Sequence, residues 1–308
     1  MNDASSVDLD CARADRAQRT ALILLLTGAA AISFSAIFVR LSELGPIATA
    51  FWRVALAAPA LGVWLAAERR HFGPAARRPR GARDWGWLLL AGFCYAGDLA
   101  TWHWSIKLTS VANSTLLANF APVFVTPAAC LLFGERISAA FLIGLALAVG
   151  GAALVMGDSL SLSAEHIAGD GLALVTAAFY AGYFLVLRHL RSVFSTATIM
   201  TWSAVVTAIF LLPLAAASGE TLIAITAFGW TILVLLALIS HVGGQSLIAY
   251  AFAHLPASFS SVALLLQPTL AAVLAWLILG ERLGRLQALG GALVLLGIAT
   301  ARRGSEAA

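Results

Sequence analysis

Residues 114–151 read STLLANFAPVFVTPAACLLFGERISAAFLIGLALAVGG, and they recur without a gap as residues 260–297, SSVALLLQPTLAAVLAWLILGERLGRLQALGGALVLLG. At the constant offset of 146, Pro122 corresponds to Pro268, and the Gly-Glu-Arg triplet at 134–136 corresponds to the one at 280–282. Several matches at one offset indicate an internal duplication. Each copy holds two apolar segments joined by a Gly-Glu-Arg turn, so the duplicated unit is built from apolar helices.

The rest of the chain is equally apolar. Of its 308 residues, 61% are hydrophobic and 11% are charged, and the mean hydropathy of +0.91 leaves too little polar surface to cover a soluble globule. The three cysteines, Cys11, Cys94 and Cys130, match no metal or redox spacing. The sequence predicts an all-α integral membrane protein.

Ten segments are long and apolar enough to cross a bilayer, which takes roughly 20 residues of helix. We predict transmembrane helices at residues 21–41, 46–67, 85–107, 110–133, 138–157, 169–190, 195–217, 226–253, 257–280 and 285–301.

Basic residues predict how these helices are oriented. The longest loop, residues 68–84, carries six arginines, and such a cluster resists translocation and stays in the cytoplasm. Counting helices from this loop puts both termini in the cytoplasm and assigns fourteen of the 19 Lys and Arg residues to that side. We therefore predict a multi-pass protein of the plasma (inner) membrane.

The duplication divides the chain into two five-helix repeats, residues 21–157 and 169–301. They are flanked by cytoplasmic tails at 1–20 and 302–308 and joined by an outer linker at 158–168. Because five is odd, the second repeat starts on the opposite side of the membrane and the two repeats have inverted topology. Many secondary transporters have this architecture, since two similar halves related by a twofold axis can exchange inward-open and outward-open shapes.

Two five-helix halves, each with a Pro in its fourth helix and a Gly-Glu-Arg turn before its fifth, resemble the EamA-type members of the drug/metabolite transporter superfamily. The Leu-Leu-Ala-Asn-Phe-Ala-Pro stretch at 116–122 and the Phe-Trp-Arg at 51–53 are similar to a subset of that family. The resemblance covers roughly residues 21–301. It implies transport of amino acids, nucleotide derivatives or other metabolites, with export favoured, and it does not name the cargo.

Two charged residues lie deep in predicted helices, where a charge is costly and marks a functional site by default. Asp98 lies about 20 Å from the cytoplasmic end of its helix and Arg53 about 10 Å from the outer end of its own. Arg53 either binds a substrate carboxylate or phosphate, reaches toward the outer headgroups, or forms a fixed ion pair with Asp98. Asp98 is either the permanent ion-pair partner of Arg53, a ligand for a substrate amine, or a proton carrier. The sequence does not determine whether its carboxyl group is charged.

One face of the third helix is polar and aromatic, because Tyr95, Asp98, Trp102 and Ser105 follow helical spacing. The offset of 146 maps Tyr95 onto His241 and Leu99 onto Gln245 in the eighth helix. These faces predict a shared substrate-binding cavity, the alternative being interhelical hydrogen bonds that only hold the bundle together. Tyr180, Tyr183, Asn113, Asn119, Gln267 and Ser35 are weaker candidates.

Other polar and helix-breaking residues have two readings each. His103 either gates the outer mouth or is a structural hydrogen-bonding residue. Pro122 and Pro268 each remove a backbone hydrogen bond, so they serve as paired hinges or as static bends. In the Gly-Glu-Arg turns, Gly ends one helix, and Glu is expected to meet the positive end of the next.

The sequence shows no nucleophile–base pair, metal cluster, paired carboxylates or phosphate-binding loop, so we predict no enzyme, no catalytic residue, no cofactor and no metal. The expected partners are a small-molecule substrate and the lipid bilayer, without nucleic acid. Proton or counter-substrate coupling stays open, as does the choice between monomer and homodimer. We predict a secondary transporter that exports a small polar or amphipathic metabolite, such as an amino acid, by alternating access around a midplane cavity. The alternative is a non-transporting scaffold or receptor-like protein, in which Arg53, Asp98 and the aromatic face are sealed by packing.

Overall fold

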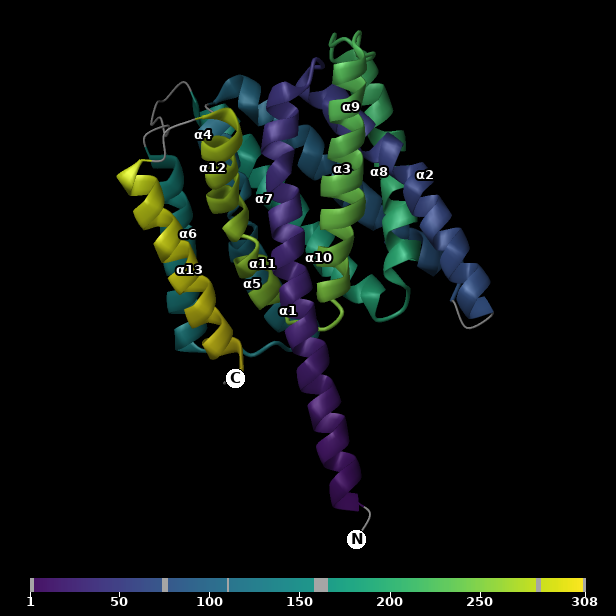
Figure 1. The fold of residues 1–308 in the computed structure, drawn as a ribbon, viewed down its shortest axis with the longest axis vertical. Helices are drawn as coiled ribbons and strands as arrows, with labels where there is room; N and C mark the ends of the chain where they lie inside the picture. Colours follow the sequence, from purple (N-terminus) through teal and green to yellow (C-terminus); the bar gives the residue numbers. More distant parts are fainter. Residues whose placement is uncertain (1–2, 74–76, 110, 158–165, 281–283, 307–308) are drawn as a thin grey trace.

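A computed structural model describes residues 3–73, 77–109, 111–157, 166–280 and 284–306, and its regular elements in those ranges are all helical (Figure 1). They are α1 (Asp3–Leu41), α2 (Pro46–Phe72), α3 (Ala82–Leu108), α4 (Val111–Ala118), α5 (Ala121–Phe133), α6 (Ala139–Met156), α7 (Ile167–Arg191), α8 (Thr196–Ala217), α9 (Ala227–Leu235), the π-helix η4 (Leu236–Gln245), α10 (Ser246–Ala251), α11 (Ala257–Ala263), α12 (Leu266–Leu279) and α13 (Arg285–Glu306).

These elements fall on the ten predicted segments, three of which are subdivided. The fourth segment is α4 plus α5, the eighth is α9, η4 and α10 in succession, and the ninth is α11 plus α12. Eight helical stretches within the described residues are long and apolar enough to span a membrane, which makes this a multi-pass membrane protein. The two segments outside that set are α3 and α13. Helix α3 carries polar and aromatic residues along its length, and α13 carries Arg302 and Arg303 near its C-terminal end.

At both ends of the chain, a helix extends into the residues predicted as a tail. Helix α1 begins at Asp3 instead of residue 21, and its first turns project beyond the bundle (Figure 1). Helix α13 likewise continues past residue 301 to Glu306. Of the predicted linker 158–168, residues 158–165 lie outside the described part of the chain.

The duplication is visible where α6 packs against α13 at one edge of the bundle (Figure 1). A Cβ added to Gly144 would lie 2.6 Å from the carbonyl oxygen of Gly297, and one added to Gly297 would lie 2.7 Å from the carbonyl oxygen of Gly144. The two backbones are therefore in direct contact, as small residues allow in membrane helix pairs. The repeat offset maps Gly144 onto Gly290 and Gly151 onto Gly297, and Gly151 and Gly290 are in the same close contact, each added Cβ lying 2.6 Å from the other's carbonyl oxygen. This pair of equivalent contacts is what a twofold relation between the repeats requires.

The repeated prolines lie just after two matching helix breaks. Helix α4 ends at Ala118 and α5 starts at Ala121, while α11 ends at Ala263 and α12 starts at Leu266. Pro122 and Pro268 fall in the first turns of α5 and α12, where the missing N–H costs least. Both segments are thus broken at equivalent positions, and their use as hinges stays a prediction.

The first Gly-Glu-Arg turn corrects one expectation. Gly134 ends α5 with φ of 67°, a left-handed conformation that favours glycine. Glu135, however, does not cap the following helix. Its carboxylate accepts hydrogen bonds from the backbone N–H of Ala257 (2.7 Å) and of Ser258 (3.0 Å), at the start of α11 in the other repeat. The second turn shares the left-handed glycine, Gly280 with φ of 68°, while its Glu281 and Arg282 lie outside the described residues.

Candidate functional site

A cavity of about 200 Å³ lies inside the bundle, in the half where α1 ends and α2 begins. Helices of both repeats form its walls: α1, α2, α3 and α4 from the first, and α7, η4 and α12 from the second. The predicted site residues that line it are Arg53, Tyr95, Asp98, Trp102, Gln245, His103 and Pro268. These seven residues come from four separate helices, α2, α3, η4 and α12.

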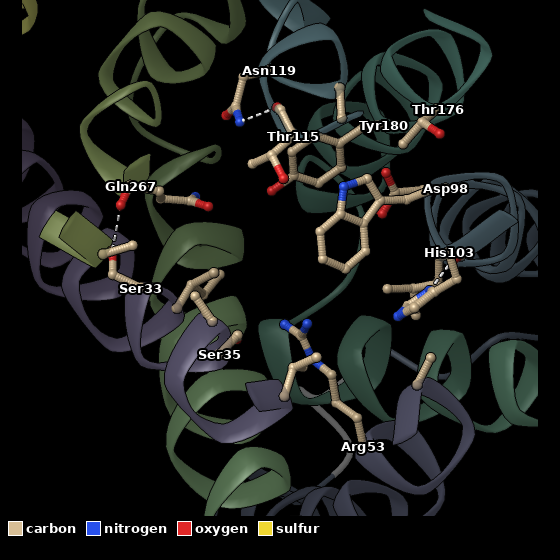
Figure 2. Close-up of a pocket in the computed structure, with 18 of the residues that line it drawn as sticks. Ser33, Ser35, Arg53, Asp98, His103, Thr115, Asn119, Thr176, Tyr180 and Gln267 are labelled. Carbon is tan, nitrogen blue, oxygen red and sulfur yellow. Dashed lines mark hydrogen bonds between the residues drawn. The ribbon is translucent and has the colours of Figure 1, made fainter. Parts of the chain in front are cut away.

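Arg53 and Asp98 both face this cavity without forming the fixed ion pair that was one expectation. Figure 2 shows their side chains entering the open space from different walls. The ion pairs of the described residues do not include Arg53 with Asp98, and the Arg53 Nε is buried without a hydrogen-bond partner. A cation and an acidic group are therefore available to whatever occupies the cavity.

Two amides supply further hydrogen-bonding groups from the second repeat. The side chain of Gln245 is 1% exposed, and its Nε2 has no hydrogen-bond partner among the described residues, as is also true of the Gln267 Nε2. Buried polar groups are normally hydrogen-bonded, because an unpaired donor costs about 1–3 kcal/mol. Ser33 Oγ lies 2.8 Å from the Ala29 carbonyl oxygen and 3.2 Å from the Gln267 carbonyl oxygen, so its single proton is shared between α1 and the start of α12. The side chains of Gln245 and Gln267 both line the cavity.

Aromatic side chains form one side and the floor of the cavity. Tyr95 and Trp102 line it from α3 and Tyr180 from α7. Toward the opposite end of the bundle, Tyr95 packs on Tyr183 with ring centroids 4.9 Å apart, and Phe184 stacks on Phe252 at 4.8 Å. Because Tyr183, Phe184 and Phe252 are fully buried, the core below the cavity is closed.

Of the main predicted residues, His241 and Pro122 do not line the cavity, and neither do the weaker candidates Asn113 and Tyr183. His241 is 1% exposed and lies behind Tyr95, whose hydroxyl is 3.5 Å from its Nδ1. The two residues related by the repeat offset are therefore direct neighbours across the interface between the repeats. His103 is also buried, and its Nδ1 hydrogen-bonds the Leu99 carbonyl, which fits the structural reading of this residue.

Several lining residues were missed or ranked low by sequence reasoning. Thr49, Thr115 and Thr176 line the cavity together with the weaker candidates Ser35, Asn119, Tyr180 and Gln267. Isolated hydroxyl residues are common in helix contacts, so only the helix faces could have singled them out. Thr176 shows why they are ambiguous, because its hydroxyl also bonds that of Thr101 at 2.8 Å and ties α7 to α3. No group of three metal-ligating side chains gathers within the described residues.

Comparison with known proteins agrees with this arrangement. The model of the EamA-like transporter family matches the chain twice, over residues 19–157 and 167–302. The chain therefore belongs to the EamA-like transporter family, a class of membrane transporters and not of enzymes.

Two relatives cover nearly the whole chain. An uncharacterized transporter of Archaeoglobus fulgidus is 27% identical over 295 residues, 91% of this chain and 96% of that protein. A probable terminal-alkyne amino-acid exporter of Streptantibioticus cattleyicolor is 29% identical over 273 residues, 87% of this chain and 88% of that protein. A protein of known crystal structure shares the fold, with a TM-score of 0.78, 18% identity and coverage of 92% of this chain and 98% of its own.

Proposed function

We propose that this protein is a secondary transporter that exports a small zwitterionic metabolite, such as an amino acid, by alternating access around the cavity. The observation that carries the proposal is that a guanidinium, Arg53, and a carboxyl group, Asp98, face one small cavity without forming an ion pair with each other. A guanidinium binds a carboxylate with two parallel hydrogen bonds, and a carboxylate accepts from an ammonium. A zwitterion satisfies both groups at once.

The size of the cavity supports a small cargo. Its volume of about 200 Å³ is below the roughly 300–1,000 Å³ typical of pockets for drug-sized ligands. An amino acid fits this space better than a nucleotide derivative does. The aromatic side chains of Tyr95 and Trp102 supply apolar surface for the rest of the substrate. The amino-acid exporter among the relatives is consistent with this substrate class and direction.

Alternating access is supported by the contrast between the two ends of the bundle. The cavity reaches toward one end, while Tyr183, Phe184 and Phe252 close the other. In a scaffold, the charged residues would instead be sealed by packing. In the proposed topology, ten spans form two inverted repeats and both termini lie on the cytoplasmic side of the plasma membrane. Exchanging the conformations of the two repeats then closes the cavity on one side of the membrane and opens it on the other. His103, Pro122 and Pro268 are then the candidate gate and hinges.

Competition in proteoliposomes tests the proposal. Purified protein is reconstituted, and counterflow of labelled amino acids is measured against unlabelled amino acids, amines without a carboxylate and carboxylic acids without an amine. Zwitterions should compete at least about tenfold better than either single-charge analogue, because each charged hydrogen bond contributes about 1.5–3 kcal/mol. Equal competition by one of the analogue classes, or absence of counterflow for every zwitterion, contradicts it. Repeating the assay with and without a pH gradient separates proton coupling from exchange.

A further inference from the structure

A second pocket, separate from the transport cavity, lies at the end of the bundle where α3 begins and α7 ends. It has a volume of about 220 Å³, and its lining residues are Arg77, Arg83, Asp84, Trp87, His189, Leu190, Val193 and Phe194. Arginines make up one part of the wall and apolar side chains the other. This combination of charge and apolar surface at a helix end has no part in the proposed transport.

The charge of the pocket is positive. Arg77 and Arg83 face a single carboxylate, Asp84, and His189 adds a further charge when protonated. Asp84 is already occupied, because it accepts from the Arg80 backbone N–H at 3.1 Å and lies 3.7 Å from the Arg77 guanidinium. That ion pair is weak, since the Arg77 side chain is 60% exposed. Arg83 has no ion pair among the described residues.

Two other basic residues of α7 do not line the pocket and are hydrogen-bonded to backbone carbonyls. Arg191 donates to the Phe194 carbonyl at 2.7 Å, and Arg188 donates to the Phe252 carbonyl at 2.7 Å. Arg77 and Arg83 are therefore the cations free to bind an anion here. The Arg77 guanidinium also lies 5.4 Å from the centre of the Phe194 ring, which holds it at the mouth of the pocket.

The apolar part of the pocket distinguishes a lipid from a free anion. The Trp87 and His189 rings pack with centroids 4.4 Å apart, and Trp is favoured where headgroups meet acyl chains. One turn further along α3, Leu90 is 39% exposed and continues the apolar surface. Free phosphate would use the arginines alone, whereas a phospholipid would also cover Trp87, Val193 and Leu90.

We propose that this pocket binds the phosphate of an anionic phospholipid, with Arg77 and Arg83 contacting the headgroup and Trp87 packing against the glycerol and first acyl carbons. Basic pockets between transmembrane helices recognise acidic headgroups in this way. The same arginine-rich loop that predicts orientation thus acts as a specific lipid site. The inference does not depend on the transported substrate.

Native mass spectrometry of the full-length protein in detergent, titrated with phosphatidylglycerol or phosphatidylcholine, tests the site. Phosphatidylglycerol should bind more tightly. Arg83→Gln should weaken its binding about fivefold, and the double variant Arg77→Gln/Arg83→Gln about 30-fold, at roughly one such factor per arginine. Arg78→Gln is the matched control, because Arg78 is an exposed arginine of the same loop that does not line the pocket. Equal losses in the control contradict the site and indicate only a general surface charge.

The variant Asp84→Asn should change phosphatidylglycerol binding in the opposite direction to the arginine variants. Removing the only carboxylate of the pocket should tighten phosphatidylglycerol binding about fivefold, whereas a purely structural role of Asp84 predicts weaker binding or a lower melting temperature. Inorganic phosphate at millimolar concentration should not displace the lipid. Displacement by phosphate, or weaker lipid binding by Asp84→Asn, overturns the proposal.

Discussion

Helix α3 and its repeat counterpart, the α9–η4–α10 segment, occupy matching places beside the cavity but contribute different chemistry. Helix α3 is one uninterrupted α-helix that brings Asp98 and Trp102 to the cavity. The counterpart contains the ten-residue π-helix Leu236–Gln245 and brings an amide, Gln245. π-Helical turns are rare and are frequent at functional sites. One copy thus carries a carboxyl group at the cavity, and the other carries an amide on a π-helical backbone.

The asymmetry extends to the whole cavity. Both charged lining residues, Arg53 and Asp98, come from the first repeat, and the lining residues that the second repeat contributes are uncharged. At the repeat offset, Asp98 corresponds to Gly244 and Trp102 to Ile248. Tyr95 and His241, which the same offset relates, are both polar, and these two contact each other. We infer that the first repeat selects the charged groups of the substrate and the second shapes the space around it.

The largest effect should follow from removing the charges of the first repeat. Arg53→Gln and Asp98→Asn should each lower transport about 100-fold, because a buried charged partner left unpaired costs about 2–5 kcal/mol. Reconstituted flux measures this, with Arg303→Gln, an exposed arginine outside the cavity, as the control. Arg53→Gln should weaken competition by carboxylic acids selectively, and Asp98→Asn competition by amines. Undiminished transport by both variants removes the two residues from the mechanism.

A smaller effect is expected from the backbone of the second-repeat segment. A Cβ at Gly244 would lie 2.8 Å from Ile32 Cγ1 and 3.0 Å from the Gly28 carbonyl oxygen of α1, whereas one at Gly243 would meet only the Leu238 carbonyl oxygen at 3.4 Å. Gly244→Ala should therefore destabilise the protein by about 1–3 kcal/mol. Gly243→Ala should be tolerated. Melting temperatures of the two purified variants measure the difference, and equal melting temperatures would mean that η4 is not held against α1.

The amides of the second repeat should matter less than the charges. Gln245→Leu and Gln267→Leu each remove a neutral donor at the cavity wall, and a neutral hydrogen bond contributes about 0.5–1.5 kcal/mol. Transport should fall about tenfold at most, mainly through a higher KM. Gln18→Leu, outside the cavity, is the control. A loss as large as that of Arg53→Gln would show that the repeats share substrate recognition equally.

The sequence was sufficient for the helices and for the charged residues that line the cavity, because both depend on local patterns. Apolar runs set the ten segments, and the spacing of Tyr95, Asp98 and Trp102 set one cavity face. The family assignment is confirmed by the match of both repeats. The π-helix carries no comparable signal, since it depends on how Gly244 packs against α1. Glu135 was placed at the wrong helix, because its partners Ala257 and Ser258 are brought to it only by the packing of the two repeats.

The smallest effect concerns the carboxylate that holds the start of the second-repeat segment. Glu43, in the turn between α1 and α2, accepts a hydrogen bond from Thr226 Oγ1, and also from the backbone N–H groups of Ile225 at 3.0 Å and Thr226 at 3.2 Å. The hydrogen bond from the Thr226 hydroxyl, followed by those from the backbone, lowers the pKa of Glu43. Because the folded pKa lies below the unfolded one, the ionised side chain stabilises the fold above about pH 4.3, the ordinary value for Glu, and this stabilisation is lost as the pH falls through the folded pKa.

The pH dependence of Glu43→Gln isolates this contribution. Wild type should melt at a higher temperature than Glu43→Gln at pH 7, and the gap should narrow progressively as the pH is lowered from about 4.3, because the Glu43 carboxylate is then protonated. Glu306→Gln is the matched control, since among the described residues Glu306 pairs with Arg302 in the last turns of α13, far from Glu43 in the chain. Because Glu43 is exposed to solvent, the change in melting temperature should be the smallest of the four effects predicted for the two repeats. A gap that stays constant with pH would mean that Thr226 alone starts α9, through its hydroxyl on the Gly229 N–H at 3.0 Å, and that the second-repeat segment is positioned without help from the first repeat.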